Sequence, residues 1–299
     1  LQSGTLDFSF VVLYLLPLLL LICLYNIKGA EADGGFLRLI YAQTGTQGPW
    51  LLARVAFYGS LIMLIMGGLM LYGAMLTPVF SSASSAFWQG LLWIFGYLLL
   101  WGVGFGLILR QGNSSIGNTL KMVGLWLLFA FIIPATIHQW VSIQQPANLM
   151  TELIDAQRDQ KYEIYDLPDS VVQAHLNEMF PKIINSPVAQ DSNKIVAARN
   201  RSFYALTNEL AKNSIKQIET TNEERNELIQ ASYWFNPLSF MQNKLNSISQ
   251  TDYQDYKNYR AEIQALVDKQ IRVLVLDMWQ DVAVDKKRYV EYEEMLSTF

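Results

Sequence analysis

Few side chains in this chain could carry catalysis or hold a metal ion. The only histidines are His138 and His175, the only cysteine is Cys23, and neither an HExxH nor a GxSxG motif occurs. A zinc site needs several His, Cys or carboxylate ligands close together, and a hydrolase of the nucleophile-elbow type needs the second motif. We therefore expect no catalytic residue, no metal site and no bound cofactor, and a structural or surface role for both histidines.

A short charged segment near the N-terminus is more informative. Glu31, Asp33 and Arg38 lie beside apolar residues at positions 36, 37, 39 and 40, and this spacing predicts a short amphipathic helix at a membrane surface. Such a helix could bind lipid headgroups or a cytoplasmic partner. The periodicity alone does not choose between these two roles.

Four apolar stretches must position this segment. They cover residues 8–27, 55–76, 87–109 and 120–141, and each is close to the roughly 20 residues that a helix needs to cross a bilayer. These stretches predict an all-α membrane protein with four transmembrane helices in residues 1–142 and a connecting loop at residues 28–54. A GxxxG pair, Gly102 and Gly106, indicates close helix packing in the third stretch, within the subunit or between subunits. Pro17 and Pro134 predict kinks in the first and fourth stretches.

The second half of the chain has a different composition. Residues 143–299 contain 17 of the 22 Lys and Arg and 23 of the 26 Asp and Glu. Apolar spacings of three and four predict helices from about 170 to 184, 195 to 230 and 251 to 279. We expect a mostly helical second domain over residues 143–299.

The positions of the few cations in the membrane half predict its orientation. Lys28, Arg38 and Arg54 flank or lie in the first connection, Arg110 and Lys121 bracket the third, and the other short connections contain neither Lys nor Arg. Because cytoplasmic loops retain positive residues, the segment at residues 28–54 is expected in the cytoplasm and residues 143–299 outside it.

Three successive aromatic residues, Tyr233, Trp234 and Phe235, interrupt the second domain. Three neighbours cannot all face one core. They are read either as a helix end folded over the core, or as a contact surface for a partner subunit or for membrane headgroups.

The charged segment resembles a family signature. Glu31-Ala-Asp33-Gly-Gly35-Phe-Leu37-Arg38-Leu39, continuing to Gln43, is similar to the Glu-x-Glu-x-Gly-Thr-Leu-Arg-Leu motif of ABC-2 type permeases. Asp33 replaces the second Glu, and Phe36 stands where Thr is usual. The resemblance implies a coupling helix that docks into the ATPase subunit of an exporter, with these residues at the contact: Glu31, Asp33, Gly35, Leu37, Arg38, Leu39 and Gln43.

The rest of the chain is similar to a branch of that family with a large outer domain of unknown role between its fifth and sixth spans. Landmarks include Tyr165-Asp-Leu-Pro168 and Trp234-Phe-Asn-Pro237. The four stretches would correspond to the second to fifth spans, so the chain is expected to be a fragment that lacks the first and last. The resemblance implies a multi-pass protein of the bacterial cytoplasmic (inner) membrane with residues 143–299 periplasmic or extracellular.

The expected function is therefore that of a permease subunit of an ATP-driven exporter. No GxxxxGK[ST] loop occurs, so ATP must be bound by a partner ATPase subunit. The other expected partners are a second permease subunit, in a homodimer or heterodimer, and the lipid bilayer; nucleic acid is not expected. The alternative is a receptor-like or scaffolding membrane protein whose outer helical domain binds a ligand or partner.

Overall fold

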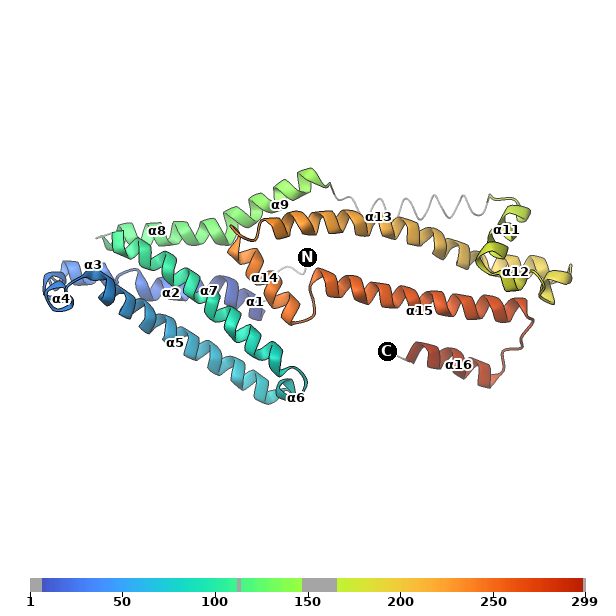
Figure 1. Cartoon of the computed structure of the whole chain (residues 1–299), viewed down its shortest axis with the longest axis horizontal. Helices are drawn as coiled ribbons and strands as arrows, with labels where there is room; N and C mark the ends of the chain where they lie inside the picture. Colours follow the sequence, from blue (N-terminus) through green and yellow to red (C-terminus); the bar gives the residue numbers. More distant parts are fainter. Residues whose placement is uncertain (1–6, 112–113, 147–165, 298–299) are drawn as a thin grey trace. The chain divides into compact units, whose positions relative to one another are not determined.

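In a computed structural model, which describes residues 7–111, 114–146 and 166–297, the chain forms two compact units. Unit 1 comprises Leu1–Ile143 and Leu228–Asp252, and unit 2 comprises Gln144–Glu227 and Tyr253–Phe299. Every regular element in the described residues is helical (Figure 1). The predicted all-helical fold is confirmed for that part of the chain.

Four helices of unit 1 are long and apolar enough to cross a membrane. They span Phe8–Ala32, Gln47–Leu76, Ser84–Gln111 and Ser115–Gln144, with 25 to 30 residues each. The first consists of α1 (Phe8–Phe10), π-helical η1 (Val11–Leu15), α2 (Leu16–Leu24) and all of α3 (Ile27–Asp33) except its last residue. The second is α5 (Gln47–Leu76), and the third is α7 (Ser84–Gln111), preceded by the short α6 (Val79–Ser82). The fourth consists of α8 (Ser115–Leu127), π-helical η2 (Leu128–Ile132) and α9 (Ile133–Gln144). These helices match the four predicted stretches and extend beyond them at most ends.

Each of the two π-helical segments ends two residues before a proline, Pro17 or Pro134. Pro17 has no N–H, so the Leu13 carbonyl, which would accept from residue 17 in an α-helix, loses that donor. The Tyr97 hydroxyl of α7 donates a hydrogen bond to this carbonyl at 3.0 Å. A predicted local distortion is thus observed as a widened turn, and a side chain of a neighbouring helix satisfies the released carbonyl.

Unit 1 includes a helix that the sequence did not lead us to expect, in a region that we had assigned to the second domain. The sequence predicted one domain for all of residues 143–299, but Leu228–Asp252 groups with the long helices. The reason is α14 (Pro237–Ile248), whose side chains Leu238, Met241 and Leu245 are buried in the same apolar core as residues of η1, α2 and α7. The buried Asn236 caps this helix, because its side-chain oxygen accepts a hydrogen bond from the Ser239 N–H at 3.2 Å.

Unit 2 contains α11 (Asp169–Met179), two 3₁₀ turns (Pro181–Ile183 and Val188–Gln190), α12 (Ile195–Arg201), α15 (Tyr253–Trp279) and α16 (Lys286–Ser297). Most of α13 (Phe203–Ala231) also belongs to it. Its apolar core surrounds Trp279, which is fully buried and donates its indole N–H to the Ser202 hydroxyl at 3.0 Å.

Two of the helices predicted for this region are shorter than expected. The helix expected to reach residue 184 ends at Met179, because Pro181 cannot continue the α-helical hydrogen bonding and begins a 3₁₀ turn. The helix expected from 195 to 230 is interrupted at Ser202, where the hydroxyl bonds to the Ala198 carbonyl and to Trp279. The third prediction, from 251 to 279, agrees with α15.

Polar side chains join α13 to α15 in unit 2. Asp268 accepts hydrogen bonds from Asn208 at 2.8 Å and from Gln264 at 2.9 Å, and it pairs with Lys212 at 2.8 Å. Burial alone would raise the pKa of the Asp268 carboxyl, but the hydrogen bonds from Lys212, Asn208 and Gln264 outweigh burial and lower it. This carboxylate is therefore held in its charged form.

Candidate functional site

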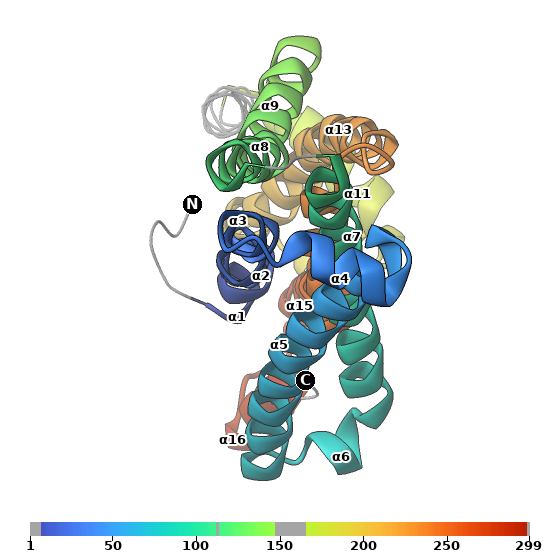
Figure 2. The same ribbon diagram turned by 90° about the vertical axis from the view of Figure 1, so that its left-hand side faces the viewer.

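The segment that resembles the coupling motif folds as two short helices joined by a tight turn. We call residues 26–46 the elbow; it contains α3 (Ile27–Asp33) and α4 (Leu37–Thr44). Gly35 in the turn has φ +74° and Gly45 after α4 has φ +71°, left-handed conformations that favour glycine. Figure 2 views the end of unit 1 at which the elbow lies.

Lys28 fixes the elbow to the end of α7. Its side chain is only 1% exposed, and its ammonium donates to the carbonyls of Leu109 at 3.2 Å and Arg110 at 3.4 Å. The same group donates to the side-chain oxygen of Gln47, the first residue of α5, at 3.2 Å. The last carbonyls of a helix lack intrahelical partners and carry partial negative charge, so they suit a buried ammonium. One side chain thus joins α3, α5 and α7.

A second contact fixes the elbow to the start of α8. A Cβ atom on Gly29 would lie 2.4 Å from the Ser115 Cβ, so only glycine permits this approach of α3 to α8. Beside it, the Ser115 hydroxyl donates a hydrogen bond to the Asn26 side-chain oxygen at 2.7 Å. Together with the Lys28 contacts, these interactions connect the elbow to α5, α7 and α8, which belong to the second, third and fourth of the long helices.

The predicted docking acids lie on α3 rather than on α4. Glu31 pairs with Arg54 of α5, with 3.1 Å between Arg54 Nη2 and Glu31 Oε1. The Glu31 side chain is 22% exposed and that of Arg54 is 44% exposed. Glu31 is therefore engaged within the chain while still reachable at the surface. Asp33 is the last residue of α3, and its side chain lies outside what the structure describes.

Helix α4 has two distinct faces. Leu37, Ile40 and Tyr41 are partly buried, and α4 lies against α5 and α3. Burial raises the pKa of the Tyr41 phenol, which stays neutral. Phe36, just before the helix, and Leu39 are 62% and 57% exposed, and the next residue at this helical spacing, Gln43, is also exposed. Exposed apolar side chains at this spacing can form a contact surface for a partner.

The predicted docking residues therefore divide into three sets. Leu37 and Glu31 are at least partly buried in unit 1, Gly35 shapes the turn, and Arg38, Leu39 and Gln43 are exposed on α4. Phe36, which departs from the family pattern, adds the most exposed apolar side chain of the segment. This surface combines a cation with apolar groups, a combination that suits the binding of a protein or of lipid headgroups.

The structure gives no basis for a metal site among the residues it describes. No group of three or more His, Cys, Asp or Glu side chains could hold an ion there. His138 on α9 and His175 on α11 are both exposed.

The other predicted contact residues also have clear positions. A Cβ on Gly102 would lie 3.3 Å from the Val55 side chain of α5, and one on Gly106 would lie 3.9 Å from it, so the GxxxG pair packs inside unit 1. The aromatic row divides: Tyr233 makes an edge contact with Phe240 of α14, with 5.8 Å between ring centroids, while Trp234 is 86% exposed beside Phe235.

Sequence reasoning missed the residues that anchor the elbow. Lys28 entered the prediction only as a charge that sets orientation, and Asn26, Gly29 and Ser115 were not singled out. The available signal was the position of Lys28, the first charged residue after twenty uncharged ones. Its burial depends on where α7 ends in space, which no local pattern shows.

A comparison with protein families matches residues 140–294, the part of the chain that includes α14, α11 to α13, α15 and most of α16, but not the elbow. No curated protein and no solved structure matches the chain. Because the matched segment covers just over half of the 299 residues, the chain belongs to the family described as a domain of unknown function, DUF3526.

Proposed function

We propose that the chain is the membrane-spanning permease subunit of an ABC-2 type exporter, driven by a separate ATPase subunit that docks on α4. The observation that carries the proposal is the elbow: the segment that resembles the coupling motif presents an exposed apolar face and is anchored to three of the four long helices. In this account the elbow lies in the cytoplasm of a bacterium, and the chain crosses the inner membrane four times.

Force applied to α4 would reach the spans through specific contacts. Closure of the ATPase subunits would displace the elbow as a body, because its two helices are short and joined by a tight turn. Lys28 would pass this displacement to the end of α7, the Glu31 to Arg54 pair to α5, and the contact of Gly29 with Ser115 to α8. Shifts of packed helices of this kind can switch a bundle between two arrangements.

The opposite half of unit 1 offers a place for such a switch. Helix α14 contacts α7 and both π-helical segments, η1 and η2. Widened turns recur at functional sites and at bends in helices. A rotation of the spans at η1 and η2 would therefore move α14, which belongs to the sequence region that we place outside the cytoplasm. Motion that begins at the ATPase would in this way reach residues 143–299 outside the cytoplasm.

The proposal includes a second permease subunit, identical or different, that completes the pathway. The described parts of the four spans hold no charged residue near their middle. An ionic or proton pathway usually needs one, so we favour a hydrophobic, lipid-linked or peptide cargo.

Affinity purification from native membranes tests the partner. The proposal expects the chain to bring down a protein with a GxxxxGK[ST] loop, identified by mass spectrometry, and expects the ATPase activity of the complex to exceed that of the isolated ATPase subunit. Recovery of a kinase instead, or of no nucleotide-binding protein, would support the receptor-like alternative.

Substitutions in the elbow test the docking surface. Leu39→Asp places a charge on the exposed face of α4 and should abolish ATPase stimulation with normal membrane insertion. Glu31→Arg should do so as well, but it also breaks the pair with Arg54. The charge swap Glu31→Arg with Arg54→Glu restores the pair while reversing the charge that a partner would meet.

The swap separates two roles for Glu31. Continued loss of stimulation in the swapped variant would place Glu31 at the docking contact, and recovery would assign it to the internal pair. Undiminished stimulation in the Leu39→Asp variant would reject α4 as the docking helix.

A further inference from the structure

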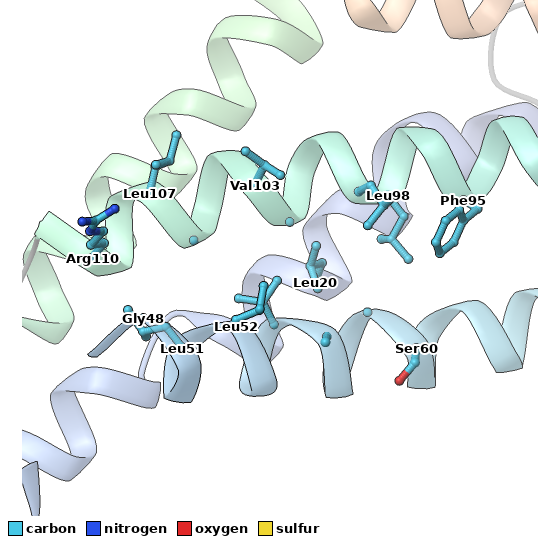
Figure 3. A pocket seen from close by; sticks show the side chains of 16 residues that line it. Leu20, Gly48, Leu51, Leu52, Ser60, Phe95, Leu98, Val103, Leu107 and Arg110 are labelled. Carbon is cyan, nitrogen blue, oxygen red and sulfur yellow. The ribbon is translucent and has the colours of Figure 1, made fainter. Parts of the chain in front are cut away.

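An apolar groove runs between α5 and α7 in unit 1. Its volume is about 520 Å³, within the range of about 300 to 1,000 Å³ that is typical of ligand sites. Figure 3 shows Arg110 at one end, Phe95 and Ser60 at the other, and Leu20 of α2 between the two helices. Small residues open the space, among them Gly48, Ala56 and Gly59 on α5.

The groove is open to whatever surrounds the spans. Leu52 on one wall is 70% exposed and Val103 on the other is 61% exposed. Since both walls belong to helices long enough to cross a bilayer, the medium at this opening is the acyl-chain region. From Phe95 to Arg110 the groove follows α7 for about 22 Å, more than half of the roughly 30 Å hydrocarbon core. One acyl chain from a single leaflet fits this length.

The polar end of the groove carries positive charge. Arg110 is exposed there, and no described side chain forms an ion pair with it. The Lys28 ammonium lies 3.4 Å from the Arg110 carbonyl, which adds a second positive charge at this end. Guanidinium groups bind phosphate through paired hydrogen bonds, and basic pockets between spans bind anionic headgroups.

We infer that the groove holds an anionic phospholipid, with one acyl chain between α5 and α7 and its headgroup phosphate on Arg110. The apolar walls would select for an acyl chain, and the charge at one end would select a net negative headgroup over a zwitterionic one. This site does not depend on the proposed exporter activity. It requires only that the four helices cross a bilayer.

Native mass spectrometry of the full chain in detergent tests this inference. The chain is mixed with equal amounts of phosphatidylglycerol and phosphatidylcholine that carry the same acyl chains. We expect phosphatidylglycerol adducts to dominate. Arg110→Gln should weaken phosphatidylglycerol retention about ten-fold, the factor for losing one charge-assisted hydrogen bond. Lys121→Gln, which removes an exposed cation from the same end of unit 1, should leave it unchanged.

A second variant fills the groove. A Cβ on Gly59 would meet no atom within 4 Å, so Gly59→Leu can fold and place its side chain in the groove, and retention of both lipids should fall. Gly73→Leu adds the same side chain to α5 in open space outside the groove and is the control.

Three results would overturn the inference. The first is equal retention of the two lipids by the unchanged chain, and the second is full phosphatidylglycerol retention in both Arg110→Gln and Gly59→Leu. The third is a dimer that Gly59→Leu dissociates while lipid retention is unchanged, which would show that a second copy of the chain fills the groove.

Discussion

Replacement of Lys28 by Met tests whether a buried ammonium holds the elbow to the spans. Methionine keeps the apolar stem of the side chain and removes only the charge and its hydrogen bonds. The three acceptors, Gln47, Leu109 and Arg110, lie at 3.2 to 3.4 Å, the long end of the usual range. The variant therefore isolates the polar contribution of Lys28.

The expected cost is about 2 kcal/mol. Hydrogen bonds to a charged group contribute about 1.5 to 3 kcal/mol each, and the long distances favour the lower value. Removing the charge also removes the several kcal/mol that its burial costs. This gain offsets much of the free energy lost with the three hydrogen bonds. A favourable interaction of about 0.3 to 2 kcal/mol with the C-terminal end of α7 is lost as well.

Equilibrium unfolding in mixed micelles measures this cost, with the fluorescence of the eight tryptophans as the signal. Lys121→Met is the matched control, because Lys121 is exposed at the same end of unit 1 and its loss should change stability by less than about 0.5 kcal/mol. Hydrogen exchange of the α3 and α4 amides should rise in the Lys28 variant alone. Equal stabilities of the two variants would refute the anchoring role.

Three further predictions concern other parts of the chain. Gly29→Ala should destabilise unit 1 by about 1 to 3 kcal/mol, because its Cβ would lie 2.4 Å from a side-chain carbon of α8; a normal thermal midpoint would contradict this. Trp279→Phe removes the hydrogen bond to Ser202 and should cost about 2 kcal/mol in chemical unfolding, whereas Trp234→Phe, at an exposed position, should cost almost nothing. The pKa of Asp268 is lowered in the folded chain, so its contribution to stability is complete above its unfolded value of about 4 and is lost as the pH falls through the folded value. Asp268→Asn should therefore reduce the loss of stability below about pH 4. If the free energy of unfolding of this variant falls below about pH 4 as steeply as that of the unchanged chain, the prediction is wrong.

The long helices of unit 1 were predictable because hydropathy is a local property. Each predicted stretch lies within a helix of the structure, and a π-helical turn ends two residues before each of Pro17 and Pro134, where we expected kinks. The short helix at the elbow was also visible in its apolar spacing. In these cases the residues that determine the structure are neighbours in the sequence.

The position of α14 was not predictable in the same way. Leu238, Met241 and Leu245 recur at spacings of three and four and indicate an amphipathic helix. Nothing local shows that the partner of this apolar face is the core of unit 1 instead of unit 2. The break at Ser202 is similar, because it depends on Trp279, which lies 77 residues away in the chain.

The candidate site likewise contains residues that the sequence identified and contacts that it did not. Exposed residues such as Arg38 and Leu39 were named from their resemblance to a known motif, and the structure places them on one short helix. The contacts that hold that helix join residues 81 and 89 positions apart, as between Lys28 and Leu109 and between Asn26 and Ser115. Such contacts follow from how helices are arranged in space, and a single sequence does not contain that information.

Photo-crosslinking in living cells identifies the protein that contacts α4. A photoreactive amino acid replaces Leu39, 57% exposed on α4, and in a separate strain replaces Leu76, 70% exposed at the other end of α5. We expect the probe at Leu39 to crosslink to a protein with a GxxxxGK[ST] loop and the probe at Leu76 not to do so. A crosslink to such a protein from Leu76, or none from Leu39, would contradict this expectation.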